Sequence, residues 1–535
     1  MSKICTAAQA VSGIRDGQTV AGVGVIGWIT PDCLLKALAD RFEREQSPRN
    51  LTFYFPCGTG DAMEIGGMDW VARKGLMKRL VAGSYINPVH PRTGERPKVM
   101  QLINRNEIEA YSWPIGASMQ WLREVARRGP GYLTKVGIGT YIDPDNGGGK
   151  FTAMATEDLV EKVEFQGEEY LFYRTWPLDY CFIRASSADE YGNLSFESEG
   201  LMSSALALAL ATKASGGTVI AQVMRTVDRY SRAAGEVRIP GAFVDKVVVD
   251  PDQVMVTDTP FDTRYLSPMN LDLGSLPRIP FGADKIIGRR AYMEVPKQTL
   301  TILGFGAASD MPLVMVEDGV LNERTIGDYR FTTEHGSYGG IVMTGWQFSA
   351  NMWPEALLDG VTQFDAIDGG LCECTALSFA EFDAAGNVNV SKFGSASPGA
   401  GGFIDIAHNA RKAIFAGTFT TGGLAIAVRD GALHIDKEGR TRKFVNQAAH
   451  ITYAVGKGVA ERGQRALVIT ERAVFAVNGD GLELIEIAPG IDLQTDILDQ
   501  MEFAPKISPA LATMEAWIFS DQPLKVDVAH AAEVR

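Results

Sequence analysis

The chain has 535 residues, 46% of them hydrophobic, which is enough to bury a large core and to form more than one domain. Its 65 acidic and 51 basic residues give a net charge of −14, which argues against the broadly basic surface that nucleic-acid binding requires. The first ten residues do not have the pattern of a secretory signal, and no apolar run is long enough to span a bilayer. We therefore expect a cytoplasmic protein that binds neither nucleic acid nor membrane.

The six cysteines are too few to form a disulfide framework in a chain of this length. The six histidines are scattered, and none is spaced from another as in a helical zinc site. No G-x-S-x-G serine elbow occurs either. We predict no metal ion and no serine nucleophile.

The first predicted strand, near residues 19–24, runs into glycines at positions 22, 24 and 27 that formally match a dinucleotide-binding loop. Such a site also needs an acidic residue after the second strand. Here the second strand, 51–56, ends in Pro56 and Cys57. The dinucleotide match is therefore weak.

Later in the chain, short apolar runs alternate with helical stretches such as 205–214. The apolar runs are 218–224, 246–249, 299–306 and 412–419. This alternation predicts an α/β protein whose largely parallel sheets are covered by helices. In such sheets, ligands bind at the carboxyl ends of the strands.

Two pairs of similar segments, which occur in the same order in the two halves of the chain, predict an internal repeat. The segment 18–35 aligns with 298–315, and 188–196 shares an Asp-x-x-Gly-Asn pattern with 381–390. We expect two similar α/β domains, the first of which carries an insertion around 60–150.

A proline-rich stretch separates the two halves, with Pro260, Pro268, Pro277 and Pro280. Prolines at this density disfavour central strands and helix interiors. We predict an N-terminal domain over 1–256, a linker over 257–281 and a C-terminal domain over 282–535.

The stretch "RFTTEHGSYGG" (330–340) places a carboxylate, Glu334, directly after a predicted strand. Glycines at 336, 339 and 340 follow it and leave the surrounding space free of side chains. Glu334 therefore stands where an α/β sheet binds its ligands.

Several segments resemble class I CoA-transferases, most closely the single-chain acetate/propionate/3-ketoacid type. In the second half these are "TTEHGSYGG" (332–340), "GNVNVSKFG" (386–394), "GAGGFIDI" (399–406) and "ITERAVFAVNGDGLELIEIAPGIDL" (469–493). In the first half they are 60–84, 137–150 and 188–194, so that the resemblance covers nearly the whole chain.

The resemblance implies a ping-pong transfer of CoA from an acyl-CoA to a free carboxylic acid. In this family the glutamate of the E-x-G-x-x-G-G turn is the nucleophile, which here is Glu334, and it carries CoA as a glutamyl thioester. No ATP, metal or permanently bound cofactor is implied, because CoA enters as a substrate. Relatives are commonly homo-oligomers, so we expect a dimer or tetramer.

Two glycine-rich loops match the family's binding segments. "GAGG" (399–402) resembles the oxyanion loop, with the Gly401 amide as the expected donor and Gly402 beside it. "GFGAA" matches the segment that contacts CoA, and its residues are Gly304, Phe305, Gly306, Ala307 and Ala308.

One position departs from the family, in which a Pro-Gln-Gly sequence supplies a further oxyanion donor. Here "EAYSWPIGASMQW" (109–121) has Ile115 at that position. Either Gln120 supplies the donor, or the enzyme uses a weaker oxyanion hole around a bulkier acyl group. We favour the second hypothesis because Trp113, Met119 and Trp121 make the stretch strongly apolar.

Other functions on this fold remain open. One is an acyl-CoA hydrolase, and another is a malonate-decarboxylase-type subunit that transfers an acyl group to a carrier protein. A non-catalytic CoA-binding protein is a third, against which the carboxylate of Glu334 argues. We expect His335 to be a polar turn residue, and Cys57 and Cys181 to belong to the core.

Overall fold

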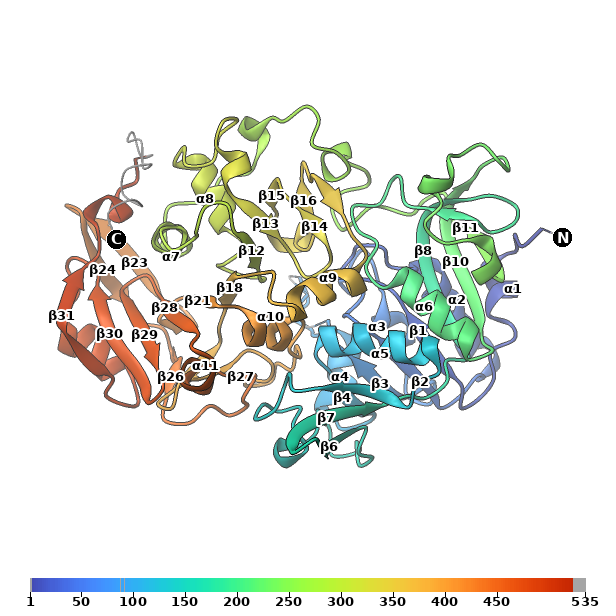
Figure 1. Cartoon of the computed structure of the whole chain (residues 1–535), viewed down its shortest axis with the longest axis horizontal. Helices are drawn as coiled ribbons and strands as arrows, with labels where there is room; N and C mark the ends of the chain where they lie inside the picture. Colours follow the sequence, from blue (N-terminus) through green and yellow to red (C-terminus); the bar gives the residue numbers. More distant parts are fainter. Residues whose placement is uncertain (1, 87, 91, 523–535) are drawn as a thin grey trace.

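The structure is a computed structural model that describes residues 2–86, 88–90 and 92–522. Its N-terminal and C-terminal halves lie side by side, each built around its own sheet (Figure 1). No helix among these described residues is long and apolar enough to cross a membrane.

The first sheet has the order β11-β10-β8-β1-β2-β3-β4, and all of these neighbours pair in parallel. Its strands are β1 (Thr19–Gly22), β2 (Leu51–Phe55), β3 (Met77–Ala82), β4 (Glu109–Ser112), β8 (Tyr180–Ala188), β10 (Thr218–Thr226) and β11 (Lys246–Val249), with β9 (Leu194–Ser195) antiparallel to β8. The helices form two groups. One is α1 (Ala7–Val11), α2 (Asp32–Glu45), α3 (Met68–Val71) and α4 (Lys98–Asn104), and the other is α5 (Ile115–Arg127) and α6 (Ala205–Ala214).

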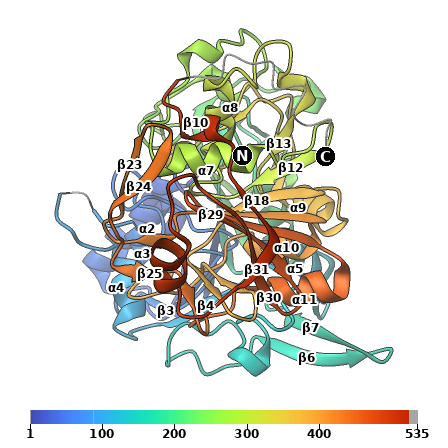
Figure 2. The ribbon, with the colours of Figure 1, turned by 90° about the vertical axis from the view of Figure 1, so that its left-hand side faces the viewer.

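The second sheet has the order β17-β14-β13-β12-β18-β21-β28-β29-β30-β31. Its strands are β12 (Leu300–Leu303), β13 (Arg330–Thr332), β14 (Ser337–Tyr338), β17 (Ala356–Leu357), β18 (Cys374–Ser378), β21 (Lys412–Ala416), β28 (Arg465–Ile469), β29 (Ala473–Asn478), β30 (Gly481–Ile487) and β31 (Lys506–Thr513). The five central strands, from β13 to β28, are parallel. Figure 2 views the molecule from the side of β29, β30 and β31, where β29 and β30 extend the sheet by antiparallel pairing and β31 pairs with β30 in parallel.

The helices of the second half also form two groups, α7 (Ala283–Tyr292) with α8 (Met311–Glu317), and α9 (Gly360–Asp368) with α10 (Phe403–Asn409). Helix α11 (Val455–Arg462) contacts β29. Smaller sheets are formed by β5 (Gly131–Thr134), β7 (Glu168–Arg174) and β6 (Val160–Phe165); by β26 (Phe444–Val445), β19 (Glu381–Asp383), β20 (Asn387–Asn389) and β27 (Tyr453–Ala454); and by the pairs β15 (Ile341–Val342) with β16 (Asn351–Met352), β22 (Thr420–Thr421) with β25 (Thr441–Arg442), and β23 (Ala425–Arg429) with β24 (Ala432–Lys437).

The two sheets confirm the predicted repeat. Strand β1 lies between β2 and β8, as β12 lies between β13 and β18, and the next strand outward is β10 in one sheet and β21 in the other. The Asp-x-x-Gly-Asn echoes form the same turn. Asp189 accepts from the backbone and side chain of Asn193, and Asp383 accepts in the same way from Asn387. Similar residues thus build the same fold twice.

The cores of the two halves interlock. One core cluster, made mainly of first-half residues, includes Ala400 and Ile404 from the second half. The other, made mainly of second-half residues, includes Cys57 and Ile115 from the first. Residues 257–281 contain only two short 3₁₀ helices, η4 (Thr263–Tyr265) and η5 (Leu273–Ser275). The halves therefore pack through a buried, apolar contact.

Candidate active site

Glu334 lies two residues beyond the end of β13, at the carboxyl edge of the parallel part of the second sheet. Its side chain is 13% exposed. Two hydrogen bonds hold the preceding residue, Thr333. Its carbonyl accepts from Gln363 Nε2 (2.8 Å), and its hydroxyl donates to the Ser349 carbonyl (2.6 Å). The backbone that carries the carboxylate is therefore fixed in place.

The turn after Glu334 requires glycine at position 336. Gly336 has φ +89°, and a Cβ at this position would lie 2.5 Å from the Leu358 carbonyl oxygen. A side chain there would both strain the backbone and clash with it. The local sequence thus allows Glu334 to lie in a tight turn at the sheet edge.

Cys57 of the first half occupies the position equivalent to Glu334 in the repeat. Val20 pairs with Phe53 in the first sheet as Leu300 pairs with Arg330 in the second, and Cys57 and Glu334 each follow four residues after the paired residue. Burial and, to a lesser extent, the Glu334 carboxylate together raise the pKa of the Cys57 thiol to about 12. The carboxyl ends of the two equivalent strands therefore meet where the halves join.

From the sequence, we expected the Gly401 amide to donate a hydrogen bond to an oxyanion. In the structure this amide already donates to a backbone carbonyl. Its N–H donates to the Gly83 carbonyl (3.0 Å), and its own carbonyl accepts from the Ile115 N–H (3.0 Å). These bonds join the 399–402 loop to the segments that follow β3 and β4 in the other half. The Gly401 amide is therefore not free to bind an oxyanion in this structure.

Gly402 instead lies directly against Glu334. A Cβ at Gly402 would be 2.6 Å from Glu334 Oε2. Within the described part of the chain, the Gly402 N–H has no hydrogen-bond acceptor. Of the two glycines, Gly402 is therefore the one that lies against the Glu334 carboxylate.

Asp405, in the first turn of α10, is a second buried carboxyl near the site. Its Oδ2 accepts from the Gly116 N–H (3.1 Å). Burial, the Asp368 carboxyl and, more weakly, Glu334 raise the pKa of Asp405 well above its usual range. An uncharged Asp405 is thereby favoured, and this limits the negative charge around Glu334.

The 304–308 loop follows β12, the strand next to β13, so it begins beside Glu334. Phe305 is 58% exposed and packs edge-on against Phe348, with ring centroids 5.4 Å apart. Gly306 has φ +104°, and a Cβ there would lie 2.5 Å from Ser378 Oγ. Ala308 is fully buried in the core. The side chain of Phe305 is therefore open to a ligand, whereas that of Ala308 is not.

The apolar stretch 109–121 belongs mostly to the core. Trp113 and Trp121 pack against each other and against Trp176 inside the first half, so they do not line the site. Ile115 Cγ1 would lie 2.6 Å from a Cβ at Gly83 and is therefore beside the loop that holds Gly401. Gln120 donates to Asp365 Oδ1 (2.8 Å). Its amide is thus engaged away from Glu334, which argues against Gln120 as the replacement donor.

The sequence analysis missed the environment of His335. The ring is fully buried; its Nε2 lies 3.5 Å from Glu334 Oε1, and its Nδ1 lies 3.3 Å from Ser203 Oγ of the first half. In the sequence, only the place of His335 next to Glu334 marked it as a candidate site residue. Nothing in the sequence indicated Ser203.

Among the described residues, no group of three or more His, Cys, Asp or Glu is arranged to hold a metal ion.

Comparison with known proteins connects this geometry to an activity. Residues 4–250 match the family model described as Coenzyme A transferase. Acetate CoA-transferase YdiF of Escherichia coli K12 is 40% identical over 531 residues, covering 99% of this chain and 97% of that protein. Caffeate CoA-transferase of Acetobacterium woodii is 39% identical over 532 residues, covering 98% of each chain.

A solved structure extends the similarity to three dimensions. The acyl-CoA transferase YdiF of Escherichia coli O157:H7, determined as a thioester complex with CoA, superposes with a TM-score of 0.89 at 39% identity, covering 98% of this chain and 97% of that one. This match agrees with the repeated α/β fold described above. The chain belongs to the CoA-transferase family and is a transferase.

Proposed function

We propose that the protein moves CoA between an acyl-CoA and a free carboxylic acid by a ping-pong mechanism, with Glu334 as the nucleophile. The observation that carries this proposal is the place of Glu334: a partly exposed carboxylate at the carboxyl edge of the sheet, against the backbone of Gly402. The thioester complex of the YdiF relative supports the same interpretation.

The first half-reaction begins when a Glu334 oxygen attacks the thioester carbonyl carbon of the acyl-CoA. The electron pair moves onto the carbonyl oxygen, and collapse of this oxyanion expels CoA thiolate and leaves a mixed anhydride. The thiolate then attacks Cδ of Glu334. A second oxyanion collapses, the bond from Cδ to the bridging oxygen breaks, and the first acid leaves as its carboxylate.

The second acid reverses these steps from the glutamyl-CoA thioester and departs as its own CoA ester. One thioester replaces another, so no ATP is consumed. The Gly402 N–H, which has no acceptor in the described part of the chain, is the donor that we assign to the oxyanion on the substrate. CoA would extend along the sheet edge past Phe305, whose ring is exposed there.

We also propose that the preferred acid is larger than acetate. Of the two relatives described above, one is named for caffeate, an aromatic acid, and the other for acetate. Ile115 lies beside the loop that carries Gly402, and isoleucine cannot donate a hydrogen bond to a small polar acyl group. This combination supports an apolar acyl group at the site.

Mass spectrometry tests the nucleophile directly. The protein is mixed with acyl-CoAs in the absence of acceptor acid, and we expect a CoA-sized adduct on the peptide that contains Glu334. Glu334→Gln keeps the shape but removes the anion, so the adduct should disappear and transfer should fall by at least about 10³-fold. Glu334→Gln with near-normal transfer and no deamidation would contradict the proposal. Release of free acid at the full rate without an acceptor would indicate a hydrolase.

A further inference from the structure

The two oxygens of Glu334 have different neighbours. Oε2 faces the Gly402 backbone, since a Cβ there would be 2.6 Å away, whereas Oε1 lies 3.5 Å from His335 Nε2. His335 Nε2 is buried and has no hydrogen-bond partner among the described residues. The carboxylate of Glu334 is therefore a polar group beside this nitrogen.

The other nitrogen of the ring determines which one carries the proton. Nδ1 lies 3.3 Å from the hydroxyl of Ser203, which can donate to it. A neutral imidazole that accepts at Nδ1 keeps its hydrogen on Nε2, and an ionised carboxylate can only accept. This tautomer satisfies the Ser203 contact and leaves an N–H on Nε2, which lies 3.5 Å from Glu334 Oε1 and makes no hydrogen bond among the described residues.

Ser203 is held in an unusual conformation to make this contact. It has φ +42°, is 1% exposed, and its carbonyl accepts from the Gly360 N–H (2.8 Å) across the boundary between the halves. A non-glycine residue in the left-handed region is strained, and such residues are often found where function requires them. The strain places a hydroxyl of one half against a histidine of the other.

We propose that His335 is a catalytic residue that donates from Nε2 to the oxyanion formed on Glu334 itself, and that Ser203 is the positioning residue that sets the ring. This inference rests on the proposed covalent mechanism. That mechanism produces two kinds of oxyanion, one on the substrate carbonyl and one on Glu334, and each needs its own donor.

The steps then divide between the two donors. Oε2 attacks the acyl-CoA, so the substrate oxyanion forms beside Gly402. When the thiolate attacks Cδ, the electron pair moves onto Oε1, where His335 Nε2–H meets it. Collapse restores the bond to Oε1 as a carbonyl, and the bond from Cδ to Oε2 breaks to release the acid.

The other candidate donors are engaged elsewhere. The Gly401 N–H donates to Gly83, and the Gln120 amide donates to Asp365. Ile115 has no side-chain donor. Among these groups, His335 Nε2 is the one that lies near Glu334 Oε1 without a hydrogen-bond partner in the described part of the chain.

The experiment isolates the oxyanion on Glu334. The glutamyl-CoA enzyme is prepared with an acyl-CoA, desalted, and treated with hydroxylamine, which attacks Cδ without forming any oxyanion on an acyl substrate. The release of CoA thiol is followed over time. His335→Leu should slow this release by about 10²–10³-fold, the usual effect of removing one oxyanion donor, while the KM for acyl-CoA changes little.

Two further variants separate chemistry from folding. His335→Gln retains a side-chain N–H and should recover most of the rate. Ser203→Gly relieves the strained φ but removes the hydroxyl, so it should keep or raise the melting temperature and still slow hydroxylamine cleavage by about 10-fold. A purely structural role would change rate and stability together.

Each result has a defined meaning. Wild-type rates in His335→Leu, or equal loss in His335→Leu and His335→Gln, would overturn the inference while leaving the Glu334 adduct in place. If His335→Leu does not fold, a wild-type rate in Ser203→Gly overturns it. If the wild-type protein forms no adduct, the proposed function and this inference both fail.

Discussion

At the scale of single residues, two adjacent glycines have separate roles that their sequence alone does not distinguish. Gly401 has φ +59°, and a Cβ there would meet nothing within 4 Å; its amide and carbonyl join the two halves. Gly402 has φ −83°, which any residue can adopt, but its Cβ position touches Glu334 Oε2. One glycine is required by the backbone and the other by the space beside the Glu334 carboxylate.

The two alanine variants should therefore separate stability from activity. Gly401→Ala forces a left-handed conformation and should lower the free energy of unfolding by about 1 kcal/mol, with little direct effect on Glu334. Gly402→Ala should leave stability nearly unchanged and reduce transfer at least about 10²-fold, because its methyl group occupies the space beside Oε2. Urea unfolding and steady-state transfer assays measure both. Loss of activity in Gly401→Ala alone would restore Gly401 to the oxyanion role.

Ile115 is the residue at which substrate size should be adjustable. Its side chain is fully buried against the backbone of Gly83, next to the loop that carries Gly402. With isoleucine, CoA esters of larger or aromatic acids should show higher kcat/KM than acetyl-CoA. Ile115→Gln adds a donor and should shift the preference toward small acids. A panel of acyl-CoAs in which acetyl-CoA is the best donor for both proteins would contradict this interpretation.

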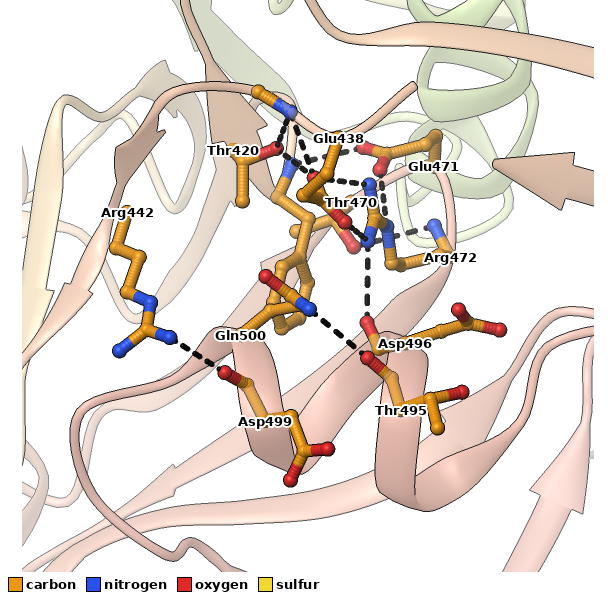
Figure 3. A network of polar contacts seen from close by, with 12 residues as sticks. Thr420, Glu438, Arg442, Thr470, Glu471, Arg472, Thr495, Asp496, Asp499 and Gln500 are labelled. Atoms are coloured by element: carbon orange, nitrogen blue, oxygen red, sulfur yellow. Dashed lines mark hydrogen bonds and ion pairs between the residues drawn. The ribbon is translucent and has the colours of Figure 1, made fainter. Parts of the chain in front are cut away.

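At the scale of elements, one arginine fastens four segments beyond the carboxyl edge of the second sheet. Arg472, in the turn between β28 and β29, binds Glu471 (2.7 Å) and Glu438 (2.7 Å), and it donates to the Asp496 carbonyl in the π-helical turn Leu493–Ile497 (3.1 Å; Figure 3). Glu471 in turn accepts from the Phe419 N–H after β21 (2.9 Å). This network holds the connections of β21 and β28 in place.

Arg472→Met should be strongly destabilising, because it leaves the fully buried Glu471 without its cation. Removing one partner of a buried pair typically costs about 3–5 kcal/mol. The matched control is Arg442→Met, which loses only one exposed hydrogen bond to the Asp499 carbonyl and should change stability by less than about 0.5 kcal/mol. Equal effects of the two substitutions would show that the network contributes no more than a surface contact.

The same network predicts a pH dependence. Burial raises the pKa of Glu438, but hydrogen bonds from Arg472 and Thr420 outweigh it, and the net pKa is lowered. The stabilisation is therefore present above the usual pKa of a glutamate and is lost as the pH falls through the lowered value. The Arg472→Met protein lacks this stabilisation at every pH, because Glu438 no longer has its arginine partner. The difference in melting temperature between the two proteins should narrow on acidification below about pH 4.5 and stay constant near neutrality.

At the scale of the whole molecule, local and long-range features were predictable to different degrees. The strand before Glu334, its glycine turn and the repeated Asp-x-x-Gly-Asn turns depend on neighbouring residues, so the sequence indicated them correctly. The engagement of Gly401 by Gly83 and the contact of His335 with Ser203 depend on how two halves pack. Partners so distant in the chain carry no local pattern. The turn that carries Glu334 could therefore be predicted from the sequence, whereas the partners of Gly401 and His335 could not.

The packing of the halves leads to a test on separated chains. The second half holds Glu334, but Gly83 and Ser203, which contact Gly401 and His335, belong to the first. A break after Met269, which is 71% exposed in the predicted linker, leaves both sheets whole. Residues 270–535 alone should form no CoA adduct on Glu334, whereas co-expression with 1–269 should restore the adduct.

The control is the full-length chain with a protease site inserted at the same place. After cleavage this protein should keep its activity, because the interlocked cores hold the halves together. Adduct formation by 270–535 alone at the intact rate would show that the first half contributes nothing to the chemistry.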